Sequence, residues 1–204
     1  GDVSGNYNGV VTGQDLSESR TEEQLIADAV AAAKNADVVL FFGGLNKASH
    51  QDCEDSDRYH LELPYAQDKV IEALAEANPN LAVVIISGNA VAMPWVDKVN
   101  AIVEGWYSGS QMGHAIADVL FGKVNPSGKL PFTFPVALAD CPVTTEEQYP
   151  GILGEDGIYQ AYYTEGIYVG YRWYEAKGIK PLFAFGHGLS YTTFAYSNLT
   201  VSQN

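Results

Sequence analysis

The sequence predicts an α/β fold: a three-layer sandwich with a mostly parallel sheet flanked by helices, followed by an aromatic-rich C-terminal arm. Three observations predict it. Apolar residues recur at helical spacing in several segments, continuous apolar runs lie between these segments, and glycine or proline marks most of the junctions. Strands that alternate with helices are typical of parallel sheets covered on both sides, and their crossovers are expected to be right-handed.

The first helix and strand are expected in residues 21–44. Residues 21–24 have the pattern of a capping box, and apolar residues at helical spacing follow them. Residues 38–42 are apolar throughout and are followed by Gly43 and Gly44. A continuous apolar run of this length is typical of a strand buried on both faces.

The same alternation continues through two more units. Pro64 is expected at the first position of the second helix, and residues 81–86 form the second buried strand. A short helix near residues 94–98 leads to a third strand over residues 101–107. Ser110 is expected to cap the next helix.

The regular alternation ends after that helix. Gly122 is expected to close it. Residues 130–134 could form one more strand, at an edge of the sheet, and residues 135–161 are irregular. Residues 162–196 are dense in tyrosine and phenylalanine, and so should pack across the sandwich or against a neighbouring domain.

Composition narrows the function classes. The chain has 204 residues, 47% of them hydrophobic, which is enough for one domain with a sizeable core. A formal net charge of -14 and the absence of basic clusters argue against nucleic-acid binding. No apolar run approaches the ~20 residues of a membrane span. The two cysteines, Cys53 and Cys141, are too few for a disulfide framework, and whether they are bonded stays open.

The segment after the first predicted strand is the candidate site. In open α/β sheets, ligands bind at the carboxyl ends of the strands. Residues 43–63 form a connection of about 20 residues, where ~4–6 are usual. It includes Asp52, Glu54, Asp55 and Asp57. Such crowding raises the pKa of at least one carboxyl group, which suits a general acid. Arg58 can pair with another carboxylate and hold the loop still.

This segment and its surroundings have other possible interpretations. On residues alone, a solvated acidic loop is the plainer interpretation. The spacing of the histidines and acidic residues in 50–60 matches no zinc or calcium loop, so no metal is expected. Phosphate-binding glycine motifs are missing, so no nucleotide cofactor is expected. Ser108 lies near His114 in the sequence, but no nucleophile elbow surrounds it.

Several segments in order resemble the C-terminal α/β sandwich domain of glycoside hydrolase family 3, in its β-glucosidase-like branch. The first are Glu54-Asp55-Ser56-Asp57-Arg58 and Leu61-Glu62-Leu63-Pro64. The next are residues 115–122, residues 125–131 and Thr133-Phe134-Pro135. The last are residues 163–172, Pro181-Leu182-Phe183 and residues 185–192. Each block is weak alone, but together they make a specific match.

The resemblance implies a retaining exo-β-glycosidase that hydrolyses terminal β-linked glucosyl residues. The family places its nucleophilic aspartate in an N-terminal (β/α)8 barrel and its acid/base glutamate in a loop of the α/β domain. That position is Glu54 here, three residues before Asp57; Asp52 and Asp55 are weaker alternatives. Asp57 and Arg58 are expected to brace the loop or bind substrate. Trp106 and Tyr107 are candidates for stacking on sugar.

The resemblance also implies how the protein is organised. Residues 1–195 would form the α/β sandwich domain without its first strands, and residues 196–204 would begin a linker or a fibronectin type III-like domain. The expected partners are the barrel, that third domain and a β-glucoside, and the isolated chain is expected to be inactive. A non-catalytic carbohydrate-binding or interdomain scaffold module is the alternative. The compartment stays open, with a periplasmic or secreted location favoured by analogy.

Overall fold

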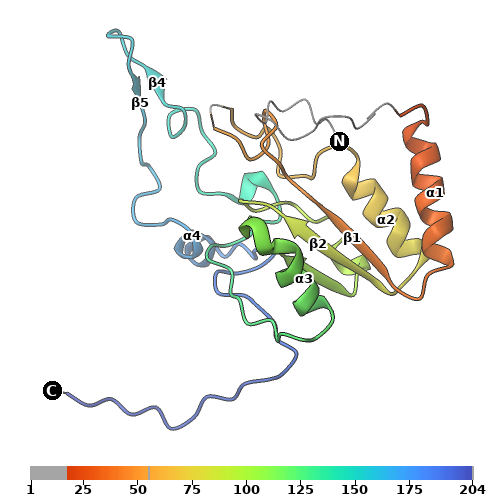
Figure 1. Cartoon of the computed structure of the whole chain (residues 1–204). Helices are drawn as coiled ribbons and strands as arrows, with labels where there is room; N and C mark the ends of the chain where they lie inside the picture. The colour runs from red at the N-terminus through yellow and green to blue at the C-terminus, as the bar shows by residue number, and fades with distance from the viewer. Residues whose placement is uncertain (1–17, 55, 204) are drawn as a thin grey trace.

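The computed structural model describes residues 18–54 and 56–203. Its centre is a parallel sheet in the order β1-β2-β3. The strands are β1 (Val39–Gly44), β2 (Leu81–Ile86) and β3 (Ala101–Glu104). All three run in the same direction, so their carboxyl ends lie at one edge of the sheet (Figure 1). The predicted parallel α/β architecture is confirmed, but the expected burial of the first strand on both faces is wrong, because Leu40 and Phe42 of β1 are 41% and 55% exposed.

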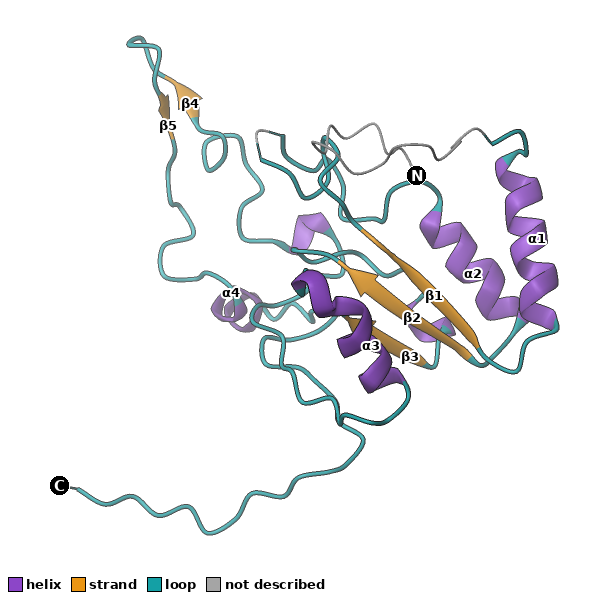
Figure 2. Cartoon of the chain, viewed as in Figure 1, coloured by secondary structure: helices purple, strands orange, loops and turns teal. Residues whose placement is uncertain are grey.

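Helices cover both faces of the sheet (Figure 2). On one face lie α1 (Glu22–Lys34), α2 (Gln67–Ala77) and the short 3₁₀ helix η1 (Val96–Lys98), and on the other lies α3 (Met112–Leu120). Strand geometry explains this division, because successive side chains of a strand point to opposite faces. Val83 and Ile85 of β2 are fully buried in the core cluster with Ile71 of α2. Ile86 points the other way, and both it and Ile116 of α3 lie beside Gly105.

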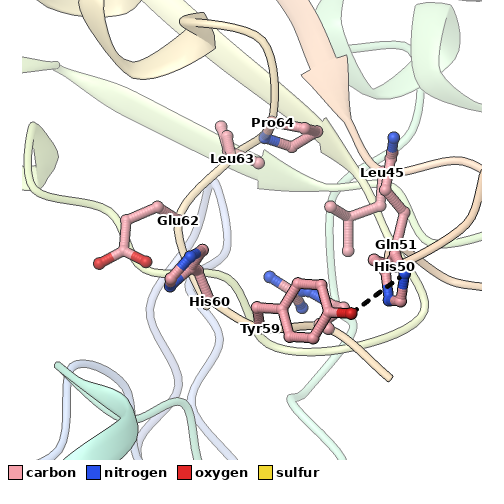
Figure 3. A pocket seen from close by; sticks show the side chains of 9 residues that line it. Leu45, His50, Gln51, Tyr59, His60, Glu62, Leu63 and Pro64 are labelled. Atoms are coloured by element: carbon pink, nitrogen blue, oxygen red, sulfur yellow. Dashed lines mark hydrogen bonds between the residues drawn. The ribbon is translucent and has the colours of Figure 1, made fainter. Parts of the chain in front are cut away.

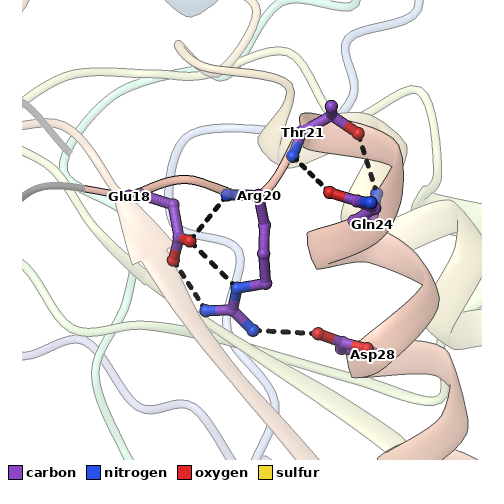
Figure 4. A network of polar contacts seen from close by, with 5 residues as sticks. All are labelled: Glu18, Arg20, Thr21, Gln24 and Asp28. Carbon is purple, nitrogen blue, oxygen red and sulfur yellow. Dashed lines mark hydrogen bonds and ion pairs between the residues drawn. The ribbon is translucent and has the colours of Figure 1, made fainter.

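The predicted capping box at the start of α1 is confirmed (Figure 4). The Thr21 hydroxyl accepts a 3.3 Å hydrogen bond from the Gln24 amide N–H, and Gln24 Oε1 accepts a 2.9 Å bond from the Thr21 N–H. Arg20 binds Glu18 at 2.6 Å and Asp28 at 2.8 Å on the exposed side of the helix. Local hydrogen bonding therefore begins α1 where the sequence indicates.

Two predicted boundaries are wrong for the same physical reason. The second helix begins at Gln67 rather than at Pro64, because Tyr65 (φ 61°) and Ala66 (φ 59°) adopt the left-handed conformation. The third strand ends at Glu104 rather than at residue 107, because Trp106 has φ 51°. Positive φ angles outside glycine are uncommon and interrupt regular structure.

Three further expectations have mixed outcomes. Ser110 does not cap α3: it lies inside a 3₁₀ turn, η2 (Gly109–Gln111), that precedes the helix. Gly122, with φ 70°, does follow the end of α3 as predicted. The possible strand over residues 130–134 is only an isolated antiparallel bridge between Phe134 and Phe183.

The segment after residue 134, called the C-terminal arm from here on, contains short elements that the sequence did not predict. They are η3 (Leu138–Asp140), the hairpin strands β4 (Ile152–Leu153) and β5 (Tyr159–Gln160), and α4 (Tyr171–Lys177). Tyr174 of α4 is buried, whereas the hairpin extends away from the sheet with exposed apolar side chains (Figure 1). The expected packing is therefore seen for only part of the arm. In the part of the chain that the structure describes, no helix combines the length and the apolar character needed to cross a membrane.

Candidate active site

The segments that follow the three strands meet at the carboxyl end of the sheet. The parallel register pairs Gly44 with Ile86 and Ile85 with Glu104, so the three strands stop at nearly the same level. Residues 45–64 continue from β1, and in this article they are called the acidic loop. Residues 87–92 continue from β2. The acidic loop therefore lies directly above the ends of the neighbouring strands.

Gly44 fixes the direction in which the acidic loop leaves the sheet. Its φ of 134° is a conformation that favours glycine, and an added Cβ would collide with the backbone of Ile86. The Gln67 side-chain amide binds both backbone groups of Gly44, at 2.7 Å to the N–H and 2.9 Å to the carbonyl. The start of the loop is thus held to the sheet and to α2.

Asp52 anchors the middle of the acidic loop. Its Oδ2 accepts hydrogen bonds from the Gly88 N–H at 2.6 Å and the Tyr107 hydroxyl at 2.8 Å, and its Oδ1 accepts one from Asn89 Nδ2 at 3.1 Å. These donors come from the segments after β2 and β3. Asp52 therefore has its acceptors occupied within the fold, which gives it a positioning role rather than that of a free acid.

Arg58 contacts two backbone segments near the end of the acidic loop. It is half-buried, and its guanidinium donates to the carbonyl oxygens of Ala90 at 2.8 Å and Leu61 at 2.9 Å. Burial lowers the pKa of this guanidinium, opposed by the charges of Asp52 and Glu62. Arg58 thus ties the acidic loop to the segment after β2 through backbone oxygens.

Glu54 lies on the wall of a large open cavity. The cavity has a volume of about 1000 Å³, and the acidic loop forms one side of it while residues 132–142 and α4 form part of the other. Glu54 is exposed and, among the residues that the structure describes, its carboxylate has no hydrogen-bond or ion-pair partner. It is therefore available to a group from outside the chain. Asp55, its weaker alternative, lies outside the described residues.

Asp57 also lines this cavity, and it is held by a residue far along the chain that lies outside the cavity lining. Its Oδ2 accepts a 2.6 Å hydrogen bond from the hydroxyl of Tyr149, which precedes the hairpin of the arm. The Asp57 carbonyl oxygen lies 2.9 Å from His50 Nδ1 within the loop. The sequence indicated neither contact, because the two partners of the first are 92 positions apart.

Trp106 and Tyr107, the candidates for stacking on sugar, lie outside the lining of the large cavity. Trp106 is half-buried and packs edge-on against Phe132 and Phe134, with ring centroids 5.7 and 6.3 Å apart. Tyr107 is 50% exposed and turns its hydroxyl toward Asp52. Neither residue lines the cavity that contains Glu54, so their contact with sugar stays a prediction.

Glu104 is a titratable residue that the sequence analysis missed. It ends β3, where burial raises the pKa of its carboxyl group to about 7, and the charge of Asp52 acts in the same direction. Hydrogen bonds from the Trp106 N–H at 3.1 Å and the Ser87 hydroxyl at 3.4 Å only partly oppose this shift. The sequence signal that could have indicated Glu104 is a single acidic residue at the end of the apolar residues 101–103.

A second cavity of about 400 Å³ lies along the acidic loop (Figure 3). In it the His50 and Tyr59 rings stack with centroids 4.3 Å apart, and His50 Nε2 lies 3.2 Å from the Tyr59 hydroxyl. Arg58 lines both cavities. The second cavity is lined by Leu45, His50, Gln51, Arg58, Tyr59, His60, Glu62, Leu63 and Pro64.

The groups that could bind a metal ion and the two cysteines can each be placed relative to this site. No group of three histidine, cysteine or acidic side chains within residues 18–54 and 56–203 is arranged to hold a metal ion. Cys53 and Cys141 are free, half-buried thiols that both line the large cavity. The arrangement instead offers an unpartnered carboxylate on a loop that is fixed from several sides, which suits proton transfer.

Comparison with known proteins identifies the family of this chain. The model of the glycosyl hydrolase family 3 C-terminal domain matches residues 1–171. The chain is 55% identical over 184 residues to the β-glucosidase BoGH3A of Bacteroides ovatus, covering 89% of this chain and 24% of that protein. It is 46% identical to the thermostable β-glucosidase B of Acetivibrio thermocellus, covering 94% of this chain and 24% of that protein. The chain thus spans about a quarter of the length of these relatives.

Solved structures give the same picture. The β-glucosidase DesR of Streptomyces venezuelae, in complex with D-glucose, superposes with a TM-score of 0.77 at 43% identity, over 85% of this chain and 21% of that one. A β-glucosidase of Bifidobacterium adolescentis superposes with a TM-score of 0.76 at 42% identity, over 89% of this chain and 25% of that one. Sequence and fold agree: this chain belongs to the glycosyl hydrolase family 3 C-terminal domain family.

Proposed function

We propose that this chain is the part of a retaining β-glucosidase that supplies the general acid/base, Glu54, for hydrolysis of terminal β-linked glucosyl residues. The nucleophilic carboxylate belongs to an N-terminal (β/α)8 barrel outside these 204 residues. The observation that carries the proposal is the position of Glu54: exposed on a large cavity, without a partner among the described residues, in a loop held at both flanks.

The proposed reaction has two steps with one proton carrier. Glu54 donates its proton to the leaving glycosidic oxygen while the barrel carboxylate attacks the anomeric carbon, so that a glycosyl-enzyme ester forms. Glu54, now ionised, then takes a proton from water as the water displaces the ester and releases glucose. In retaining enzymes the two carboxyl groups are ~5–5.5 Å apart, so the loop must approach the barrel closely.

The other candidate residues have supporting roles in this proposal. Asp57 and Arg58 hold the acidic loop, and Tyr107 is the better of the two aromatic candidates for sugar because half of its surface is exposed. We propose residues 1–195 as the sandwich domain. Residues 196–203 are exposed and without regular structure, as a connection to a fibronectin type III-like domain would be.

Glu54→Gln in the full-length protein tests the function. The variant should cleave cellobiose about 10²–10⁴-fold more slowly, because the leaving alcohol needs a proton. A 2,4-dinitrophenyl β-glucoside should still form the glycosyl-enzyme, and Glu54→Ala with added azide should release β-glucosyl azide. Glu175→Gln, on the exposed side of α4, is the matched control.

Two results would count against the proposal. Cellobiose turnover by Glu54→Gln at the wild-type rate would remove Glu54 from the chemistry and favour a non-catalytic carbohydrate-binding or scaffold module. The isolated 204-residue chain is expected to be inactive. Turnover by that chain, abolished by Glu54→Gln, would show that the site is complete without a barrel.

A further inference from the structure

The hydrogen bond between Tyr149 and Asp57 connects the loop that contains Glu54 to the segment that precedes the hairpin. The cavity beside Glu54 is lined by residues 47, 51–54, 56–58 and 61 of the acidic loop, by residues 88–90, and by residues 132, 133, 135, 141, 142, 170 and 174, and Tyr149 lies outside this lining. The Tyr149 hydroxyl donates a 2.6 Å hydrogen bond to Asp57, three residues after Glu54. The hydrogen bond therefore connects the C-terminal arm to the part of the acidic loop that contains Glu54, the proposed acid.

Tyr149 is itself held in place by a compact turn. The Gln148 side chain accepts from the backbone N–H groups of Thr144 and Thr145 and donates to Pro142 and to Glu165, all within 3.2 Å. The Tyr149 N–H donates to the Thr145 carbonyl at 3.1 Å. The hydroxyl of Tyr149 therefore projects from a fixed backbone, and it is suited to hold another segment.

The acidic loop has local contacts of its own, but they do not fix it against the arm. Ser56 Oγ lies 3.0 Å from Ser49 Oγ and accepts from the His50 N–H at 3.0 Å. These bonds close the turn upon itself. Asp52 and Arg58 tie the loop to the sheet side, which leaves Tyr149 as the tie to the arm side among the hydrogen bonds of the described residues.

We infer that Tyr149 is a positioning residue for the acid/base step. By holding Asp57, it fixes the position of Glu54 on the cavity wall, and so the distance between the Glu54 carboxyl group and the glycosidic oxygen. The inference rests on the proposed function of Glu54. Proton transfer is sensitive to such placement, because small displacements of a catalytic group sharply reduce the rate. Tyr149 touches no reacting atom and acts only through the loop.

Tyr149→Phe in the full-length protein tests this role, since it removes one hydroxyl from an exposed residue. We expect kcat for cellobiose to fall by about tenfold with little change in KM. Turnover of the 2,4-dinitrophenyl β-glucoside in its glycosylation step should stay close to wild type, because that leaving group needs no proton. Tyr159→Phe, on the exposed hairpin of the same arm, is the matched control and should leave both rates unchanged.

A double-mutant cycle separates the hydrogen bond from other effects of the tyrosine. If the bond to Asp57 transmits the effect, Tyr149→Phe should not slow an Asp57→Ala enzyme any further. Equal losses on both substrates, additive losses in the cycle, or no loss in Tyr149→Phe would each overturn the inference. Glu54→Gln is assayed in parallel: if it retains wild-type activity the proposed function fails, whereas a loss there with an unaffected Tyr149→Phe refutes the positioning role alone.

Discussion

The hydroxyl group of Tyr107 lies 2.8 Å from Oδ2 of Asp52, 55 positions earlier in the chain. The same oxygen accepts the Gly88 N–H, and Asn89 binds the other oxygen. One carboxylate therefore connects the segments that leave all three strands of the sheet. Because hydrogen bonds to charged groups are stronger than neutral ones, this carboxylate is the main anchor of the acidic loop on its sheet side.

Removing that anchor should loosen the loop more than it destabilises the fold. For Asp52→Ala we expect a loss of about 1 to 2 kcal/mol in the free energy of unfolding, measured by urea denaturation. Hydrogen exchange of amides in residues 50–60 should become faster. Asp97→Ala, at an exposed aspartate of η1, is the control. Unchanged exchange in Asp52→Ala would show that the loop is held by other contacts.

The raised pKa of Glu104 predicts a stability that falls as the pH rises. The folded protein holds the Glu104 proton up to about pH 7, whereas the unfolded chain releases it near the ordinary pKa of 4.5 for a glutamate. The stabilisation is therefore complete below about pH 4.5 and is lost as the pH rises toward 7. Glu104→Gln should be more stable than wild type at pH 8 by up to about 3 kcal/mol.

Urea denaturation of both proteins at pH 5 and pH 8 measures this difference. Glu175→Gln, on the surface of α4, controls for the loss of a negative charge in an acidic protein. If wild type and Glu104→Gln differ by the same amount at both pH values, the carboxyl group does not titrate in this range.

Two glycines should respond to alanine with opposite signs. Gly44→Ala places a Cβ against the Ile86 backbone at a φ of 134°, and we expect it to cost more than about 3 kcal/mol or to prevent folding. Gly113→Ala lies within α3, where an added Cβ meets nothing within 4 Å, and should stabilise by about 0.5–1 kcal/mol. Thermal unfolding followed by circular dichroism checks both. If Gly44→Ala and Gly113→Ala changed the stability by the same amount, the end of β1 would be able to move away from the added methyl group without cost.

Asn78 should contribute more to stability than its polar character suggests. Its buried side-chain amide donates to the carbonyl oxygens of Ala33 at 2.9 Å and Ala36 at 2.8 Å, and its Oδ1 accepts from the Asn80 N–H. We expect Asn78→Ala to cost about 2 to 3 kcal/mol, because two backbone carbonyl groups, one of them in the buried Ala33, lose a hydrogen bond. Asn35→Ala, which loses an exposed bond to Ala31, should cost about 0.5 kcal/mol in the same denaturation experiment.

The sequence predicts the sheet well because its strands have a simple pattern. Residues 81–86 are apolar without interruption, and they form β2 at those positions. Helix starts are less predictable. The capping box at Thr21 works through neighbouring residues, whereas α2 starts late because Tyr65 and Ala66 take left-handed angles, which no residue type there indicates.

The site is predictable in its location and less so in its supports. The length and acidity of the loop after β1 indicate the place, and the family resemblance singles out Glu54. The contacts of Asp52 with Gly88 and of Asp57 with Tyr149 join residues 36 and 92 positions apart. Contacts at such separations depend on the packed chain, so local pattern could not indicate them.

The close approach of Asp52 to Gly88 has a consequence for how such an enzyme could change. A methyl group at position 88 would lie 3.3 Å from Asp52 Oδ2 and 3.1 Å from the Tyr107 ring, so these two neighbours would have to yield. If Glu54 is the proton donor, as proposed, substitution of this one glycine would displace Asp52 and with it the loop that contains Glu54, while every residue of that loop stays the same. Under the proposed function, leaving-group preference would therefore change with a residue of the segment after β2, without any substitution in the acidic loop.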